Sequence, residues 1–118
     1  MESRGTAVDY NFPAAQREAF IARGVRYTLD MQALAKARGM GFQLVIVPSV
    51  VEVRAGRHAA AVAGYMARMH AAGITPIDLM PTLSTDNYWS HDIHFRESGA
   101  KFAARAIVAA LPAAPGGR

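Results

Sequence analysis

The sequence contains no cysteine among its 118 residues. Disulfides and thiolate metal ligands are therefore excluded, although the cellular compartment stays open. The longest uncharged apolar stretch is far too short to span a bilayer. The opening MESRGTAVDY also lacks the apolar segment of a signal peptide. As written, the sequence predicts a cytoplasmic chain without a membrane span; a periplasmic or extracytoplasmic location stays open if the N-terminus is missing.

Clusters of charge are scarce as well. Thirteen Lys and Arg against nine Asp and Glu give a net charge of +4, but no basic run alternates with aromatic residues. Nucleic-acid binding proteins usually concentrate positive charge on one face, so the pattern argues against a nucleic-acid partner. With 52% hydrophobic and 19% charged residues, the composition is that of one globular domain over residues 1–118, with a flexible tail at 112–118.

Residues up to Gly39 predict two helices. Asn11 is a candidate cap for the first, Pro13 stands in its first turn, and Gly24 interrupts it. The second helix runs on to Gly39 and Gly41. Four of its residues form a stripe at helical spacing: Tyr27, Met31, Leu34 and Ala35.

A strand–helix–strand unit follows. FQLVIV (42–47) and ITPIDLM (74–80) are short apolar runs that predict strands, and RHAAAVAGYMARMHAAG (57–73) between them predicts a helix. Such a unit crosses over right-handed and pairs its strands in parallel. The sequence therefore predicts an α/β fold, a partial three-layer α/β/α arrangement with a short parallel sheet. Two strands make a poor core, which suggests a larger domain, a complementing chain, or self-association through the open sheet edge.

A last helix is predicted from Glu97 or Ser98 to Pro112. The residues expected on its inner face are Phe102, Ala103, Ala106, Ile107, Ala110 and Leu111.

The segment YWSHDIHF (88–95), just before this helix, holds the strongest chemical motif. Asp92 and His94 follow the second predicted strand, and sites gather at the carboxyl ends of parallel strands. Histidine can take and return a proton near neutral pH when an acceptor holds its other ring nitrogen. The pair is therefore a candidate catalytic dyad. Two alternatives stay open: a metal site that also uses His91, and a structural turn with His94 packed on Trp89.

Four pieces occur in a characteristic order: LVIVPS, GITPIDLMP, NYWSHDIHF and SGAKFAARAI. Through them the segment 42–111 resembles the SGNH (GDSL-like) hydrolase and acyltransferase superfamily, most closely the branch that contains alginate O-acetyltransferases. The resemblance implies a flavodoxin-like fold in which Asp92 orients His94 as general base. It also implies that Gly99 lets the last helix approach the loop closely.

The resemblance implies a serine nucleophile that the sequence does not match, because no G-D-S block is present. Ser49 follows a predicted strand but lacks the setting of a nucleophile elbow. The other serines are expected in turn, cap or entry segments: Ser3, Ser84, Ser90 and Ser98. The chain thus resembles the half of the domain that carries the Asp/His block, and alone it is expected to be inactive.

The remaining candidates are assigned structural roles. Asp78 is expected to satisfy backbone amides at its strand end, while His58 and His70 are expected at the surface. Trp89 fits a substrate pocket and a packing role equally.

In the complete protein, the resemblance implies ester hydrolysis or O-acyl transfer, an acylated carbohydrate or small ester as substrate, and no cofactor. The alternative is a truncated, non-catalytic α/β interaction module.

Overall fold

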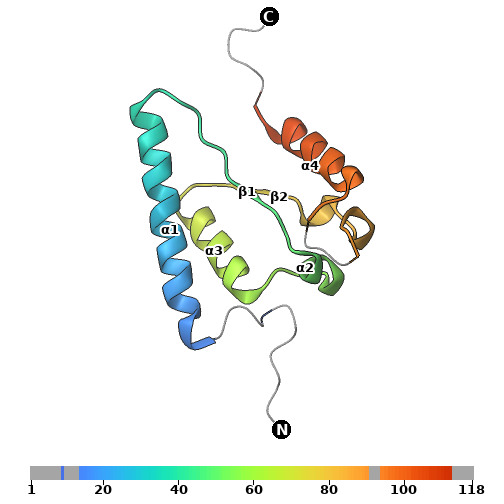
Figure 1. Cartoon of the computed structure of the whole chain (residues 1–118). Helices are drawn as coiled ribbons and strands as arrows, with labels where there is room; N and C mark the ends of the chain where they lie inside the picture. The colour runs from blue at the N-terminus through green and yellow to red at the C-terminus, as the bar shows by residue number, and fades with distance from the viewer. Residues whose placement is uncertain (1–8, 10–13, 91–93, 113–118) are drawn as a thin grey trace, which may run out of the picture.

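The computed structural model describes residue 9, residues 14–90 and residues 94–112. The elements in chain order are α1 (Ala14–Ala37), β1 (Val45–Ile46), α2 (Val50–Ala55), α3 (Ala60–Ala71), β2 (Ile77–Asp78), the 3-10 helices η2 (Met80–Thr82) and η3 (Thr85–Asn87), and α4 (Glu97–Ala110). The strands lie between α1 and α3 on one side and α4 on the other (Figure 1). This arrangement confirms the predicted partial α/β fold. No helix in the described ranges has the length and apolar character that crossing a membrane requires.

α1 is one continuous helix, so the predicted interruption at Gly24 is wrong. A Cβ atom at Gly24 would lie 3.4 Å from the ring of Tyr65 on α3, so the two helices pack against each other at this glycine. The end of α1 agrees with the prediction. Gly39 has φ +67°, and Met40 N–H donates to the carbonyl of Ala35 at 2.8 Å, as in a Schellman motif. The predicted cap Asn11 lies outside the described residues.

The two strands pair in parallel, as predicted, with Val45 opposite Ile77 and Ile46 opposite Asp78. Both are shorter than predicted: the apolar runs 42–47 and 74–80 each contribute two residues. Within the described ranges the sheet contains only these strands, so each has one neighbour to pair with. Gly73 adopts the left-handed conformation, with φ +83°, just after the end of α3, and the chain continues from there into β2.

α2 is a helix of six residues that the sequence reading did not predict. Its start is a complete capping box. The Ser49 side chain accepts from Glu52 N–H at 3.1 Å, and the Glu52 carboxylate accepts from Ser49 N–H at 2.9 Å. Gly56, with φ +72°, ends the helix. Ser-x-x-Glu was the sequence signal for this element.

One apolar cluster joins β2, η2 and α4. Its buried members are Leu79, Leu83, Tyr88 and Ala103. α4 contributes a narrower face than predicted, because Ala103 is buried but Phe102 and Leu111 are 42% and 44% exposed. Ala103 lies at the centre of the contact, and Phe102, one residue earlier, is rotated by about 100° around the helix. The cluster supports the segment that carries the Asp-x-His motif.

Candidate active site

The described residues around the motif, residues 88–90 and 94–95, pair with each other and are together called the hairpin. Tyr88 and Phe95 form an antiparallel bridge, and Trp89 N–H donates to the carbonyl of His94 at 3.1 Å. The rings of Tyr88 and Phe95 meet edge to face, with centroids 5.1 Å apart. These contacts fix the backbone at the end of the motif, while the His94 side chain lies at the surface.

The base of the hairpin is locked against the start of α4. Arg96 N–H donates to the carbonyl of Asn87 at 2.7 Å, and the Asn87 amide donates to Ser98 Oγ at 3.2 Å. A Cβ atom at Gly99 would lie 2.4 Å from the same Asn87 carbonyl oxygen, far inside contact distance. The expected close approach at Gly99 is thus confirmed. Only glycine fits here without a shift of backbone.

A side-chain hydrogen bond ties the hairpin to the segment that follows β1. The Tyr88 hydroxyl donates to the carbonyl of Pro48 at 2.7 Å, and Pro48 lies two residues after the carboxyl end of β1. Burial raises the pKa of the Tyr88 phenol, and the negative charge of Glu52 raises it further. The hydroxyl therefore stays protonated and can donate. The hairpin lies at the carboxyl edge of the parallel sheet, where the sequence placed the site.

The same edge holds a cluster that sequence reasoning missed. His58 Nδ1 lies 3.1 Å from a carboxylate oxygen of Glu52, and His58 Nε2 lies 2.9 Å from one of Asp78. The His58 side chain is only 12% exposed. The prediction that His58 lies at the surface is therefore wrong, because most of its side chain is covered by protein. The cause is that α2 places Glu52 beside it, and α2 was not foreseen.

Glu52 is the hub of this cluster. Besides His58, its carboxylate accepts from Ser49 N–H and from Ala59 N–H, the latter at 2.8 Å. Burial alone raises the pKa of Glu52, but these hydrogen bonds together outweigh it and lower the pKa below its ordinary value. The ionised carboxylate thus joins the start of α2 to the start of α3.

Asp78 has the role that the sequence predicted, and a second one. Its carboxylate accepts from Met80 N–H at 2.9 Å, which satisfies a backbone amide after the strand end. It also faces His58. Glu52, His58 and Asp78 therefore form a partly buried polar chain across the carboxyl ends of both strands.

Comparison with known proteins identifies the family. A family model for the SGNH hydrolase-like domain of the acetyltransferase AlgX matches residues 8–118. The chain belongs to this family. No curated protein and no solved structure matches it. The resemblance inferred from the sequence is thereby confirmed, and the edge just described is that of an SGNH hydrolase-like domain.

The dyad itself is described only in part. His94 is placed, whereas Asp92 and His91 lie outside the described residues. The catalytic pairing of Asp92 with His94 stays a prediction, and so does the three-ligand metal alternative. Within the described ranges no group of three His, Asp or Glu side chains is arranged to hold a metal ion.

Three of the serines described near this edge have structural partners. Ser49 caps α2, Ser84 forms a capping box with Asn87 at η3, and Ser98 Oγ accepts from the Asn87 amide. Trp89 is 52% exposed, and the guanidinium of Arg96 lies over its ring, 5.0 Å from the centroid. Trp89 therefore lies at the surface beside the hairpin rather than in the core.

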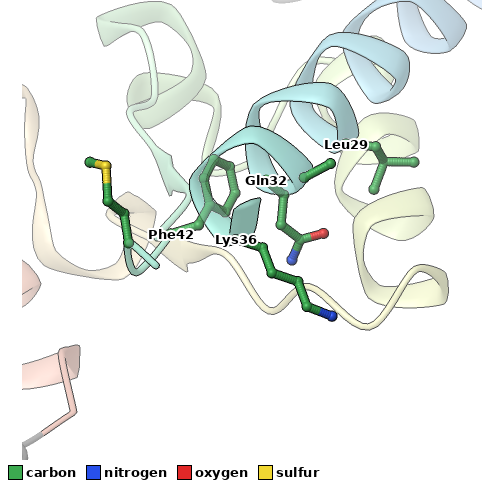
Figure 2. Close-up of a pocket in the computed structure, with 6 residues that line it drawn as sticks. Leu29, Gln32, Lys36 and Phe42 are labelled. Carbon is green, nitrogen blue, oxygen red and sulfur yellow. The ribbon is translucent and has the colours of Figure 1, made fainter. Parts of the chain in front are cut away.

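A hollow of about 510 Å³ lies elsewhere, between α1 and the segment that follows it. Figure 2 shows Phe42 on one side of Gln32 and Lys36, with Leu29 on the other. No residue of the hairpin or of the His58 cluster lines this hollow, so it is not part of the candidate active site.

Proposed function

We propose that this chain supplies the Asp/His arm of an SGNH-type acyl-transfer site. Asp92 accepts from His94 Nδ1–H and fixes the tautomer, so that Nε2 carries the lone pair. His94 Nε2 takes the proton of a serine hydroxyl as the serine oxygen attacks an acyl carbonyl. His94 then returns the proton to the leaving alkoxide as the acyl–serine ester forms. Water or an acceptor hydroxyl resolves this ester by the same steps in reverse.

The observation that carries the proposal is the anchored hairpin. The Trp89 to His94 hydrogen bond and the Tyr88 to Pro48 hydrogen bond hold the His94 backbone at the carboxyl edge of the sheet. The ring itself remains at the surface, where a second component can reach it. A general base needs both a fixed position and access to its proton donor.

The nucleophile in this proposal comes from outside the 118 residues. The sequence has no G-D-S block, and Ser49, Ser84 and Ser98 are engaged in caps and turns. The substrate class follows the family: an O-acyl ester, with acetyl on a carbohydrate hydroxyl as the proposed case. The chain alone is expected to bind such esters weakly and not to turn them over through an acyl–serine.

Nitrogen-15 NMR of the His94 imidazole tests the dyad directly. We expect the neutral ring to show the Nδ1–H tautomer in the unaltered chain and a tautomer mixture in Asp92→Asn. The matched control is Asp86→Asn, which removes an acidic side chain from η3 and leaves the tautomer unchanged. The same mixture in all three proteins would contradict the dyad and favour the non-catalytic interaction module.

A fluorophosphonate probe tests the external serine. Intact mass should show no adduct on the folded chain, because none of its serines is activated. An adduct that disappears in His94→Ala would contradict this part of the proposal and place the nucleophile within these 118 residues.

A further inference from the structure

α1 exposes a row of large apolar side chains. Phe20, Tyr27, Met31 and Leu34 are 40%, 56%, 53% and 51% exposed. The neighbouring positions Ile21 and Thr28 are buried, and they belong to the face that packs on α3. α1 lies at the edge of the molecule with α3 along one side of it (Figure 1). A contiguous apolar row on an otherwise polar helix marks an interaction surface.

The spacing of the row is that of a coiled-coil seam. Phe20, Gly24, Tyr27, Met31 and Leu34 are separated by four, three, four and three residues. Two opposite charges, Arg23 and Asp30, stand one heptad apart. At about 100° per residue they fall on the side of the seam away from Ile21 and Thr28. The side of the seam away from α3 therefore carries one positive residue, Arg23, and one negative residue, Asp30.

We propose that α1 is the interface of a two-fold symmetric dimer, in which α1 of a second copy packs antiparallel along this seam. In this register Tyr27 lies over the half-buried Gly24 of the second copy, and Met31 lies opposite its Phe20. Arg23 then faces Asp30 of the second copy, and symmetry repeats the ion pair. Both charges of the flank are thereby matched.

The charges select this register over its neighbours. A shift by one heptad brings the two Asp30 carboxylates of the dimer together and leaves Arg23 opposite Ala37. A parallel pair brings Arg23 opposite Thr28 and Asp30 opposite Ala35, which makes no ion pair at all. The antiparallel arrangement also opposes the two helix dipoles.

A second copy is the occupant because the surface is complementary to itself. Two-fold symmetry requires each patch to meet an identical patch, and the Arg23–Asp30 pair meets that requirement at one register. The interface is distinct from the open edge of the sheet and does not depend on the proposed acyl-transfer site.

Sedimentation equilibrium of the full chain tests the proposal, over concentrations from about 1 to about 500 μM. We expect a concentration-dependent dimer, and Met31→Glu should abolish it by placing a charge in the seam. Val108→Glu is the control, since Val108 is 71% exposed but lies on α4. A chain that is monomeric throughout, or a dimer that survives Met31→Glu, would overturn the proposal. A surviving dimer would point instead to association through the open, unpaired side of the sheet.

Charge reversal tests the register. Arg23→Asp and Asp30→Arg should each raise the dissociation constant of the dimer about tenfold, because each creates two pairs of like charges across the interface. An equimolar mixture of the two variants should dimerise as tightly as the unaltered chain, since every flank pair is then opposite in sign. Lys36→Glu changes the net charge as Arg23→Asp does, and it should leave dimerisation unchanged. A mixture no tighter than its components would refute the antiparallel register.

Discussion

Folded proteins usually bury apolar side chains and expose charged ones. The carboxyl edge of the sheet departs from this pattern by covering charged side chains, and the outer face of α1 departs from it by exposing apolar ones. At the sheet edge, Glu52, His58 and Asp78 are largely covered by protein, and each is paired. On α1, side chains such as Tyr27 and Met31 are more than half exposed. A buried polar chain is costly unless its partners are satisfied, and an exposed apolar row is costly unless something covers it.

The difference shows how the molecule divides its tasks. At the carboxyl edge of the sheet, the polar groups find their partners within the chain. The Glu52 and Asp78 carboxylates accept from backbone amides at the start of α2, at Ala59 and after β2, and these bonds hold together the segments on which the hairpin rests. The outer face of α1 is complete only with a second surface. Substitutions at the carboxyl edge of the sheet should therefore change the stability of the isolated chain. Substitutions on the outer face of α1 should change the association of two chains.

Loss of the Glu52 carboxylate is expected to have the largest effect. Glu52→Ala leaves His58 and two backbone amides without their acceptor and should lower the free energy of unfolding by about 3 kcal/mol. Urea denaturation, monitored by circular dichroism, measures this change in the free energy of unfolding. Glu97→Ala is the control, because Glu97 is 82% exposed and forms a surface ion pair with Lys101. Equal losses in the two variants would contradict the hub role of Glu52.

The same carboxylate predicts a pH dependence. The folded-state pKa of Glu52 lies below its ordinary value of 4.5. Its contribution is therefore fully present above that value and is lost as the pH falls through the folded-state pKa. The stability difference between the unaltered chain and Glu52→Gln should shrink below about pH 4.5. Denaturation curves at a series of pH values measure this, and a constant difference would show that the charge of Glu52 is not what stabilises the edge.

Two glycines sharpen the comparison between the regions. Gly99→Ala forces a Cβ atom against the Asn87 backbone and should cost about 2 kcal/mol. Gly64→Ala on α3 meets only the end of the Ile21 side chain, at 2.7 Å. That side chain can move, and alanine favours the helix by up to about 1 kcal/mol, so Gly64→Ala should be close to neutral. Thermal unfolding of both variants decides whether the sheet edge is the more rigid region.

Removal of the hydroxyl of Tyr88 should have a smaller effect. Tyr88→Phe keeps the ring in the core but loses the hydrogen bond to Pro48, at a cost of about 1 kcal/mol. The matched control is Tyr27→Phe, which alters an exposed hydroxyl on α1 and should change stability by less than about 0.3 kcal/mol. Amide hydrogen exchange at Trp89 should quicken in Tyr88→Phe alone.

The smallest expected effect is on α1. Leu34→Gln replaces a half-exposed apolar side chain and should change the stability of the monomer by less than about 0.5 kcal/mol. Unfolding measured well below the dimerisation range tests this. A loss of several kcal/mol would mean that the outer face of α1 is packed within the monomer.

The sequence predicted elements whose signals are local. The glycine that ends α1, the parallel strand order and the start of α4 near Glu97 are all confirmed. The break at Gly24 was wrong because a single glycine costs a helix only about 1 kcal/mol, which packing against Tyr65 offsets. α2 had a local signal in Ser49 and Glu52, but its length of six residues falls below the usual periodicity window.

The position of His94 near the carboxyl edge of the sheet was predictable from the sequence, whereas the contacts that support it were not. Asp92 and His94 stand out as a motif, and their position after the second strand follows from chain order. His58 meets Asp78 across 20 residues of sequence and Glu52 through a helix that was not foreseen. The tie from Tyr88 to Pro48 spans 40 residues. Such pairings depend on tertiary packing, which no local pattern encodes.

The Tyr88 to Pro48 tie has a consequence for the order of folding. Its acceptor is a backbone carbonyl that takes its final position only after β1 is laid down, 40 residues earlier in the chain. Closing so long a loop is slow compared with forming a helix or a local turn. The hairpin that carries His94 therefore acquires its anchored form later than the helices and the local turns. The anchored position of His94 therefore exists only in the folded chain, where Tyr88 and Pro48 have come together.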